Sequence, residues 1–158
     1  MQAQEATTTA TDNPVNTPVR QLSVFLHNRV GALMALVKLL NEHQIEVLGL
    51  SIQETTEMTL ARLVLSDPES AETLFMERGI PHTSCRVIVV EIREGAHNLS
   101  LCLSALLAAE INIQFSYPLM ARPGNWPLLV LHVDEIEVGA DALHQSGLKL
   151  LGQGDLSR

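Results

Sequence analysis

Apolar and polar residues alternate near the start of the chain and then change to a helical spacing. Leu22, Val24 and Leu26 are each separated by one residue, which predicts a strand with one face against a core. Beyond Gly31 the apolar residues recur every three or four positions, as on one stripe of a helix. We expect that helix to end near His43.

The rest of the first half continues with a hairpin, a helix and a strand. Apolar runs at 47–52 and 60–65 flank a polar stretch, which predicts two strands joined by a turn. Asp67 and Pro68 open a second helix, because aspartate can accept a bond from a free backbone amide and proline needs no donor at the first helical position. A closing glycine and a strand over residues 80–84 complete the unit.

The same order of elements recurs in the second half, and individual residues match across it. The offset between matched residues is 66 before the hairpin and 68 after it, so the second hairpin is two residues longer. An internal duplication explains this agreement. The matched pairs are Leu33 with Leu99, Leu40 with Leu106, Ile45 with Ile111, Leu63 with Leu131, Phe75 with Leu143 and Gly79 with Gly147. The predicted strands of the second half are 87–92, 111–117, 128–133 and 148–151, and the predicted helices are 99–110 and 134–146.

These patterns predict an α+β fold with two ferredoxin-like βαββαβ units in tandem, each an antiparallel sheet with helices on one face. We expect a disordered tail over residues 1–18, because it holds too little apolar surface to order it. The first unit then spans 19–84 and the second 85–158. Leucines cover more than one stripe of helix 99–110, so we expect it to pack against the sister unit or another subunit. A homodimer is the expected assembly.

The amino-acid composition reduces the number of possible functions. The chain has 10 basic and 18 acidic residues, and this net charge of −8 disfavours nucleic acid and anionic membranes as partners. It lacks an apolar stretch long enough to cross a bilayer and a secretory signal, so we expect a cytoplasmic protein. Six histidines and two cysteines show no spacing typical of a metal or redox site. We therefore expect no metal, no cofactor and no enzymatic activity.

Several segments together resemble the ACT domain, a family of regulatory domains that bind small molecules. They are the strand 22–26, the loop 28–31, the apolar stripe of the first helix and the phrase 43–47; in the second half the loop is 94–97 and the phrase 110–113. The resemblance implies an amino-acid-like ligand bound where the loop and helix start of one repeat meet a neighbouring repeat. It implies the following ligand-binding residues: Asn28, Arg29, Val30, Gly31, Glu46, Val47, Glu94, Gly95, Ala96, His97 and Asn112.

The chemistry of the first loop agrees with that role. A helix that begins at Gly31 offers free amides and a positive dipole end to a carboxylate, and Asn28 can both donate and accept hydrogen bonds. Glu46 or Glu94 can meet a ligand ammonium group. Two positions depart from the family pattern: Val30 replaces the usual proline, and in the second loop we align His97 with the usual glycine. A plain strand-to-helix connection is the alternative interpretation.

Three functions stay open at this point. The first is a stand-alone sensor of an amino-acid-like effector. The second is a regulatory subunit of a separate biosynthetic enzyme, and the small subunit of acetolactate synthase is similar in length and in its ACT-like start. The third is a dimerisation module with degenerate sites, which the His97 alignment favours.

Overall fold

The computed structural model describes residues 18–157, and the predicted tail at 1–18 lies outside them except for Pro18. No helix in this described range is long and apolar enough to cross a membrane. The elements follow in the order β1 (Val19–His27), α1 (Ala32–Glu42), β2 (Val47–Glu54), β3 (Met58–Leu65), α2 (Pro68–Glu77), β4 (His82–Glu91), α3 (Ala96–Ala108), β5 (Ile113–Pro118), a short 3-10 turn (Pro123–Asn125), β6 (Leu128–Val133), α4 (Ile136–Gln145), β7 (Leu150–Leu151) and α5 (Gln153–Leu156).

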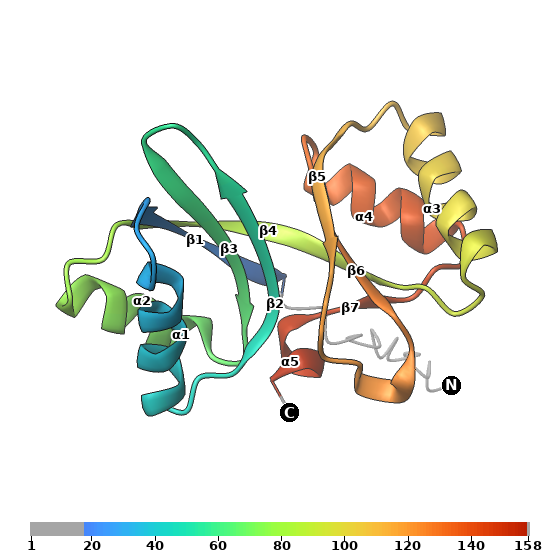
Figure 1. Cartoon of the computed structure of the whole chain (residues 1–158). Helices are drawn as coiled ribbons and strands as arrows, with labels where there is room; N and C mark the ends of the chain where they lie inside the picture. Colours follow the sequence, from blue (N-terminus) through green and yellow to red (C-terminus); the bar gives the residue numbers. More distant parts are fainter. Residues whose placement is uncertain (1–17, 158) are drawn as a thin grey trace, which may run out of the picture.

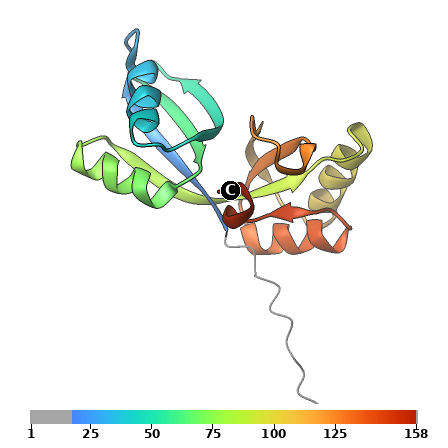
Figure 2. The same cartoon turned by 90° about the horizontal axis from the view of Figure 1, so that it is seen from below.

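The structure has the two βαββαβ units that the sequence predicts. They share the long strand β4, which was not predicted. The strands are ordered β2-β3-β1-β4-β6-β5, and β7 also pairs with β4. The first half of β4 pairs with β1 and its second half with β6 and β7. Predicted strands 80–84 and 87–92 are therefore one strand, and the predicted boundary after Ser84 falls inside it. Figure 2 shows β4 crossing from one unit to the other.

The helices of each unit cover the outer face of its own half of the sheet (Figure 1). In the first unit, Leu22 and Val24 of β1 pack with Leu36 and Leu40 of α1. The second unit has a matching core beneath α3 and α4. This is the α+β arrangement that the sequence predicts, with antiparallel strands and helices on one face.

The two faces without helices pack against each other and form a third core. Val87 and Val89 of β4 lie in it, together with Tyr117 of β5, and all three are buried. The edges meet at one end, where the amides of Met120 and Ala121 donate to the carbonyl of Leu48, at 2.7 and 3.2 Å. Each unit thus covers the face that the other would expose to water.

The internal duplication is visible in matched backbone details. The predicted offset of 66 relates Gln44 to Glu110, and both have φ of 57° at the end of a helix. The offset of 68 relates two bonds that close the later helices: the Ile80 amide donates to Phe75 at 2.8 Å, and the Leu148 amide donates to Leu143 at 3.2 Å.

Local signals explain where most helices begin. Asp67 caps α2, since its carboxylate accepts from the Ser70 amide at 3.1 Å, as the sequence predicts. The prediction was wrong for α3, which begins at Ala96 and not at Leu99. The four-residue helix α5 was not predicted; it lies at the junction of the two units (Figure 2), where Leu156 joins the shared core.

The α3 helix is less covered than its leucine content suggested. Cys102 and Leu106 are buried, but Leu99, Leu103 and Leu107 are 40%, 46% and 77% exposed. Of the two expected partners of α3, the sister unit was therefore wrong, and contact with another subunit stays a prediction. The second unit instead reaches the first through its strands.

Gly49 allows the close approach of the two units, which gives a first prediction. A Cβ at this position would lie 2.2 Å from Cδ2 of Leu119 in the other unit. We expect Gly49→Ala to lower the free energy of unfolding by about 1–3 kcal/mol, because Leu119 must leave its packed position. Urea denaturation measures this. Gly154→Ala is the control, because nothing lies within 4 Å of its Cβ position; equal effects of the two substitutions would contradict the prediction.

Candidate functional site

The loop after β1 is tied to the β2–β3 hairpin by Asn28. Its amide nitrogen donates to the carbonyl of Thr55 at 2.8 Å, and its amide oxygen accepts from the hydroxyl of Thr59 at 2.6 Å. Asn28 is thus a brace between two turns of the first unit. It keeps one further N–H and one further lone pair for another partner.

The start of α1 is left open by Gly31. This residue is the N-cap of the helix with φ of 88°, in the left-handed region that glycine favours, and nothing lies within 4 Å of its Cβ position. No described side chain caps the first turn. The neighbouring Val30 is fully exposed and Arg29 is also exposed. The helix start therefore faces solvent with free amides and a positive dipole end.

An open pocket of about 430 Å³ lies beside the hairpin that Asn28 braces. Phe25 and Leu60 line it, and along their strands they alternate with Val24 and Ala61, which face the helices. The pocket is thus on the helix-free face of the sheet, whereas α1 is on the other face. The hairpin contributes the remaining lining: Thr55, Thr56, Glu57 and Met58.

The other predicted residues of the first unit, Glu46 and Val47, are not brought to this loop. They lie at the start of β2, about 25 Å along the strand from the hairpin. There the Glu46 amide donates to the hydroxyl of Ser66 at 2.8 Å, and Val47 packs against the core under the helices. Leu48 follows directly and makes the contact with the second unit.

In the second unit the loop glycine is Gly95, which corrects the alignment with His97. Gly95 is the N-cap of α3 with φ of 54°, the place that Gly31 has before α1. The offset is 64 here because α3 begins two residues earlier than the alignment assumed. His97 is thus the second residue of the helix, and its backbone amide donates to the carbonyl of Glu94 at 3.2 Å. It is exposed, as are Glu94 and Ala96.

The surroundings of the second loop differ from those of the first. Arg93 pairs with the buried carboxylate of Glu91, and its guanidinium lies 5.7 Å from the ring centroid of Trp126. Asn112 is at the other end of the unit, where its backbone and side-chain nitrogens both donate to Asp134, each at 3.2 Å. The structure therefore keeps Asn112 apart from the loop that it was predicted to join.

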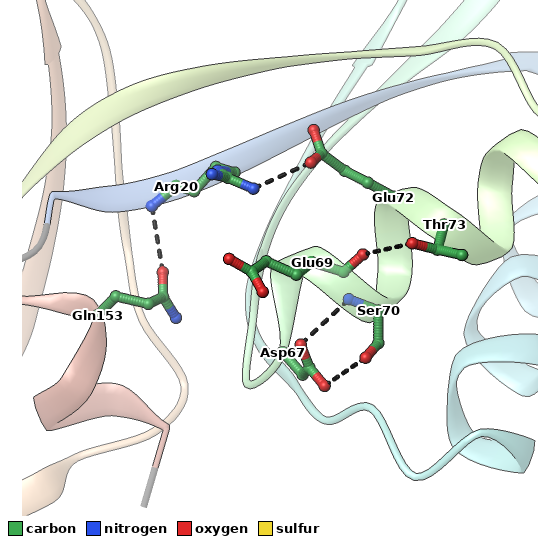
Figure 3. Close-up of polar contacts among 7 residues, drawn as sticks. All are labelled: Arg20, Asp67, Glu69, Ser70, Glu72, Thr73 and Gln153. Atoms are coloured by element: carbon green, nitrogen blue, oxygen red, sulfur yellow. Dashed lines mark hydrogen bonds and ion pairs between the residues drawn. The ribbon is translucent and has the colours of Figure 1, made fainter.

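A second pocket, of about 500 Å³, lies between the start of α2 and the C-terminal helix α5. Figure 3 shows Arg20 between Gln153 and Glu72. The backbone amide of Arg20 donates to the side-chain oxygen of Gln153 at 3.1 Å, and its guanidinium pairs with the Glu72 carboxylate at 2.9 Å. Asp67 is engaged as the helix cap, and its two bonds to Ser70 lower the pKa of its carboxyl. Arg20 and Asp67, two of the three charged residues that line this pocket, thus already have partners within the chain.

Sequence reasoning missed a polar cluster between the two units. The buried amide of Gln21 accepts from the Tyr117 hydroxyl at 2.6 Å and lies 3.5 Å from the Cys85 sulfur. The guanidinium of Arg62 crosses to the second unit and lies 3.9 Å from the ring centroid of Phe115. No single-residue signal marks these contacts, since Gln21 and Tyr117 are 96 positions apart.

His132 stacks on Phe115 in the same cluster, with ring centroids 4.6 Å apart and 3° between the planes. Its Nδ1 is buried and makes no hydrogen bond to the described residues. Burial lowers the pKa of His132, and the positive charge of Arg62 lowers it further. The neutral ring is therefore favoured between the two units.

Comparisons with known proteins come from sequence and from structure. The family model ACT domain pair matches residues 17–158. No protein of curated function matches the chain. Protein BT0572 from Bacteroides thetaiotaomicron has 23% identity and a TM-score of 0.82, and the alignment covers 90% of this chain and 98% of that chain. The ligand-free regulatory subunit of aspartate kinase from Thermus thermophilus has 12% identity and a TM-score of 0.56, over 84% of this chain and 94% of that chain.

Removing the brace at the first loop gives a second prediction. Asn28→Ala loses both bonds to the hairpin, and we expect the free energy of unfolding to fall by about 1 kcal/mol per lost bond at most. Hydrogen exchange at Thr55 and Met58 should become faster. Gln114→Ala is the control, an exposed amide with no side-chain bond to a described residue. Unchanged exchange in the hairpin of Asn28→Ala would show that the brace is unimportant.

The His132 cluster gives a third prediction, on pH. Because the folded pKa is lowered, the unfolded chain binds a proton first as pH falls below about 6.5. The free energy of unfolding should therefore decrease from there until pH has fallen past the folded pKa. His132→Phe keeps the stacked ring and should flatten this slope, measured by urea denaturation between neutral and mildly acidic pH. His144→Gln, a change at an exposed histidine of α4, should leave the slope as it is.

Proposed function

Since this chain belongs to the ACT domain family and carries two ACT units in tandem, we propose that it is a non-catalytic regulatory module that binds a small amino-acid-like effector. The effector binds at the loop and helix start of the repeats. The observation that carries this proposal is the open start of α1, where Gly31 leaves the first turn without a cap.

The first loop offers groups that suit both ends of an amino acid. Free amides of α1 and the exposed Arg29 favour a carboxylate. Asn28 is held at the mouth of the loop by the hairpin and keeps one donor and one acceptor free. Glu57, in the same hairpin, supplies a negative charge for an ammonium group. Glu46 and Val47 directly precede Leu48, whose carbonyl accepts from the second unit, and are proposed to respond to the ligand through it.

The second loop is proposed to bind as well, because Gly95 restores the glycine turn that the His97 alignment had removed. Its lining differs: Arg93, at the place of Arg29, is paired with Glu91, and Ile92 stands at the place of Asn28. We expect weaker binding of a carboxylate there, since Arg93 is already neutralised. The degenerate dimerisation module loses the observation that favoured it.

A regulatory subunit of a separate enzyme is the second candidate. Structural similarity to the aspartate kinase regulatory subunit, at a TM-score of 0.56, favours a biosynthetic enzyme as the partner. Similarity to the aspartokinase alpha and beta subunits, at a TM-score of 0.53, favours the same class of partner. The small subunit of acetolactate synthase, the candidate that the sequence suggested, belongs to the same class of regulatory subunits. In either case the effector would act in the cytoplasm by changing the activity of an amino-acid biosynthetic enzyme.

Calorimetric titration with each common amino acid tests the effector, and this is the fourth prediction. We expect at least one to bind, and Arg29→Glu to weaken that binding because it places a negative charge beside the carboxylate. Arg78→Glu is the matched control, with the same charge change on an exposed arginine at the end of α2. If no amino acid gives heat or a thermal shift at millimolar concentration, the proposal fails.

The enzyme partner is tested separately. A tagged chain should co-purify from its native cells with an amino-acid biosynthetic enzyme, whose feedback inhibition should change when the chain is removed. Ligand binding without any such enzyme would favour a stand-alone sensor.

A further inference from the structure

The outer surface of α3 is an apolar face that the other described residues cover only in part. Leu99, Leu103 and Leu107 lie four residues apart, on one stripe about 12 Å long. They are 40%, 46% and 77% exposed. Figure 1 shows α3 on the outer side of the second unit, on the side of the sheet away from the first unit. Neither the core of its own unit nor the contact between units accounts for this stripe.

The same helix carries no charged residue. Each of the other three long helices carries at least two: Lys38 and Glu42 in α1, Glu137 and Asp141 in α4, and three glutamates in α2. The duplication makes the contrast sharper, because Lys38 and Glu42 of α1 correspond to Ser104 and Ala108 of α3. The second repeat thus has small neutral residues where the first has charges.

This pattern fits contact with a second copy of the same chain. In a two-fold contact residue i of one copy meets residue j of the other while j meets i, so the surface must be complementary to itself. A stripe of equally spaced leucines meets this condition when the axis passes at Leu103. In an antiparallel pair of α3 helices, Leu103 meets Leu103 of the partner subunit, and Leu99 meets Leu107 of the partner subunit.

Small residues beside the stripe allow the two helices to approach closely. Ala96, Ser100, Ser104 and Ala108 are exposed and also recur every four residues. The charge of −8 on each chain opposes self-association through acidic surface, and α3 is the long helix on which two copies meet without like charges. The first 17 residues are a poor alternative occupant, since Met1 and Val15 are their only large apolar residues.

We propose that the chain forms a two-fold dimer through antiparallel packing of α3 against α3 of a second copy. The proposal names the interface of the homodimer expected from the sequence. It does not depend on which ligand the loops bind, because its test measures mass and not ligand binding.

Sedimentation velocity and light scattering of the full chain provide the test, which is the fifth prediction. Wild-type protein should have the mass of two chains at micromolar concentration, and Leu107→Glu should have the mass of one. Met34→Glu is the matched control: Met34 lies on α1 and is 72% exposed, close to the 77% of Leu107. It should stay dimeric. Both positions are exposed, so circular dichroism should show unchanged folding.

Cysteine cross-linking checks the geometry. After mild oxidation Leu103→Cys should form a covalent dimer across the two-fold axis, whereas Met34→Cys should not. Cys102 does not interfere, because it is buried and burial raises the pKa of its thiol to about 11. The proposal is overturned by a monomeric wild type, by a dimer that survives Leu107→Glu, by equal loss of the dimer in Met34→Glu, or by absence of the Leu103→Cys cross-link.

Discussion

The rest of the structure depends on the packing of two helix-free sheet faces against each other. A single βαββαβ unit buries one face of its sheet under helices and leaves the other face to water. Here each unit covers the other, and the shared strand β4 holds both halves in one register. Val87 and Val89 point from β4 into this common core, while Ile88 and Val90 point toward the helices of the second unit. One strand therefore serves two cores, as the period-two geometry of a strand permits.

This packing decides which parts of the molecule remain available for binding. The start of β2 and the end of β5 are used where the units meet, at the bonds from Met120 and Ala121 to Leu48. The loops before α1 and α3 lie outside that contact. Gln21 and Tyr117 bond to each other inside the contact, because a buried donor or acceptor without a partner is costly. Nδ1 of His132 is the exception among the described residues. The open helix starts are the places that we propose for a ligand.

The two repeats have diverged in ways that suit different tasks. In the first, Asn28 braces the loop against a hairpin and Arg29 is exposed; in the second, Arg93 is drawn to a buried glutamate. The first helices of the two repeats, α1 and α3, differ in the charge of their outer surfaces. The charged exterior of α1 favours contact with water, whereas the neutral leucine stripe of α3 favours contact with protein. One copy of the duplication has the more open loop before its first helix, and the other has the more apolar helix exterior.

The sequence by itself determined the order of elements, the duplication and the caps, because these depend on residues close together in the chain. Asp67 accepts from Ser70, three positions away, and period-two and helical spacing are local patterns. Gly31 as the open start of α1 was also readable, since a left-handed turn favours glycine. The second loop was misaligned because α3 has two more residues than α1 and gains them at its start, while the matched residues from Leu99 to Ile111 keep the offset of 66.

Only the tertiary structure decided how the two units share a strand, which faces they bury, and which predicted site residues come together. Nothing in residues 80–92 marks that the two predicted strands are one, because both halves of β4 have strand-like sequence. The fold also decides that Glu46 and Asn112 each lie at the opposite end of the sheet from the loop of their own unit. The pairing of Gln21 with Tyr117 and of Arg62 with Phe115 joins segments far apart in the chain, and such contacts form only when whole sheet faces meet.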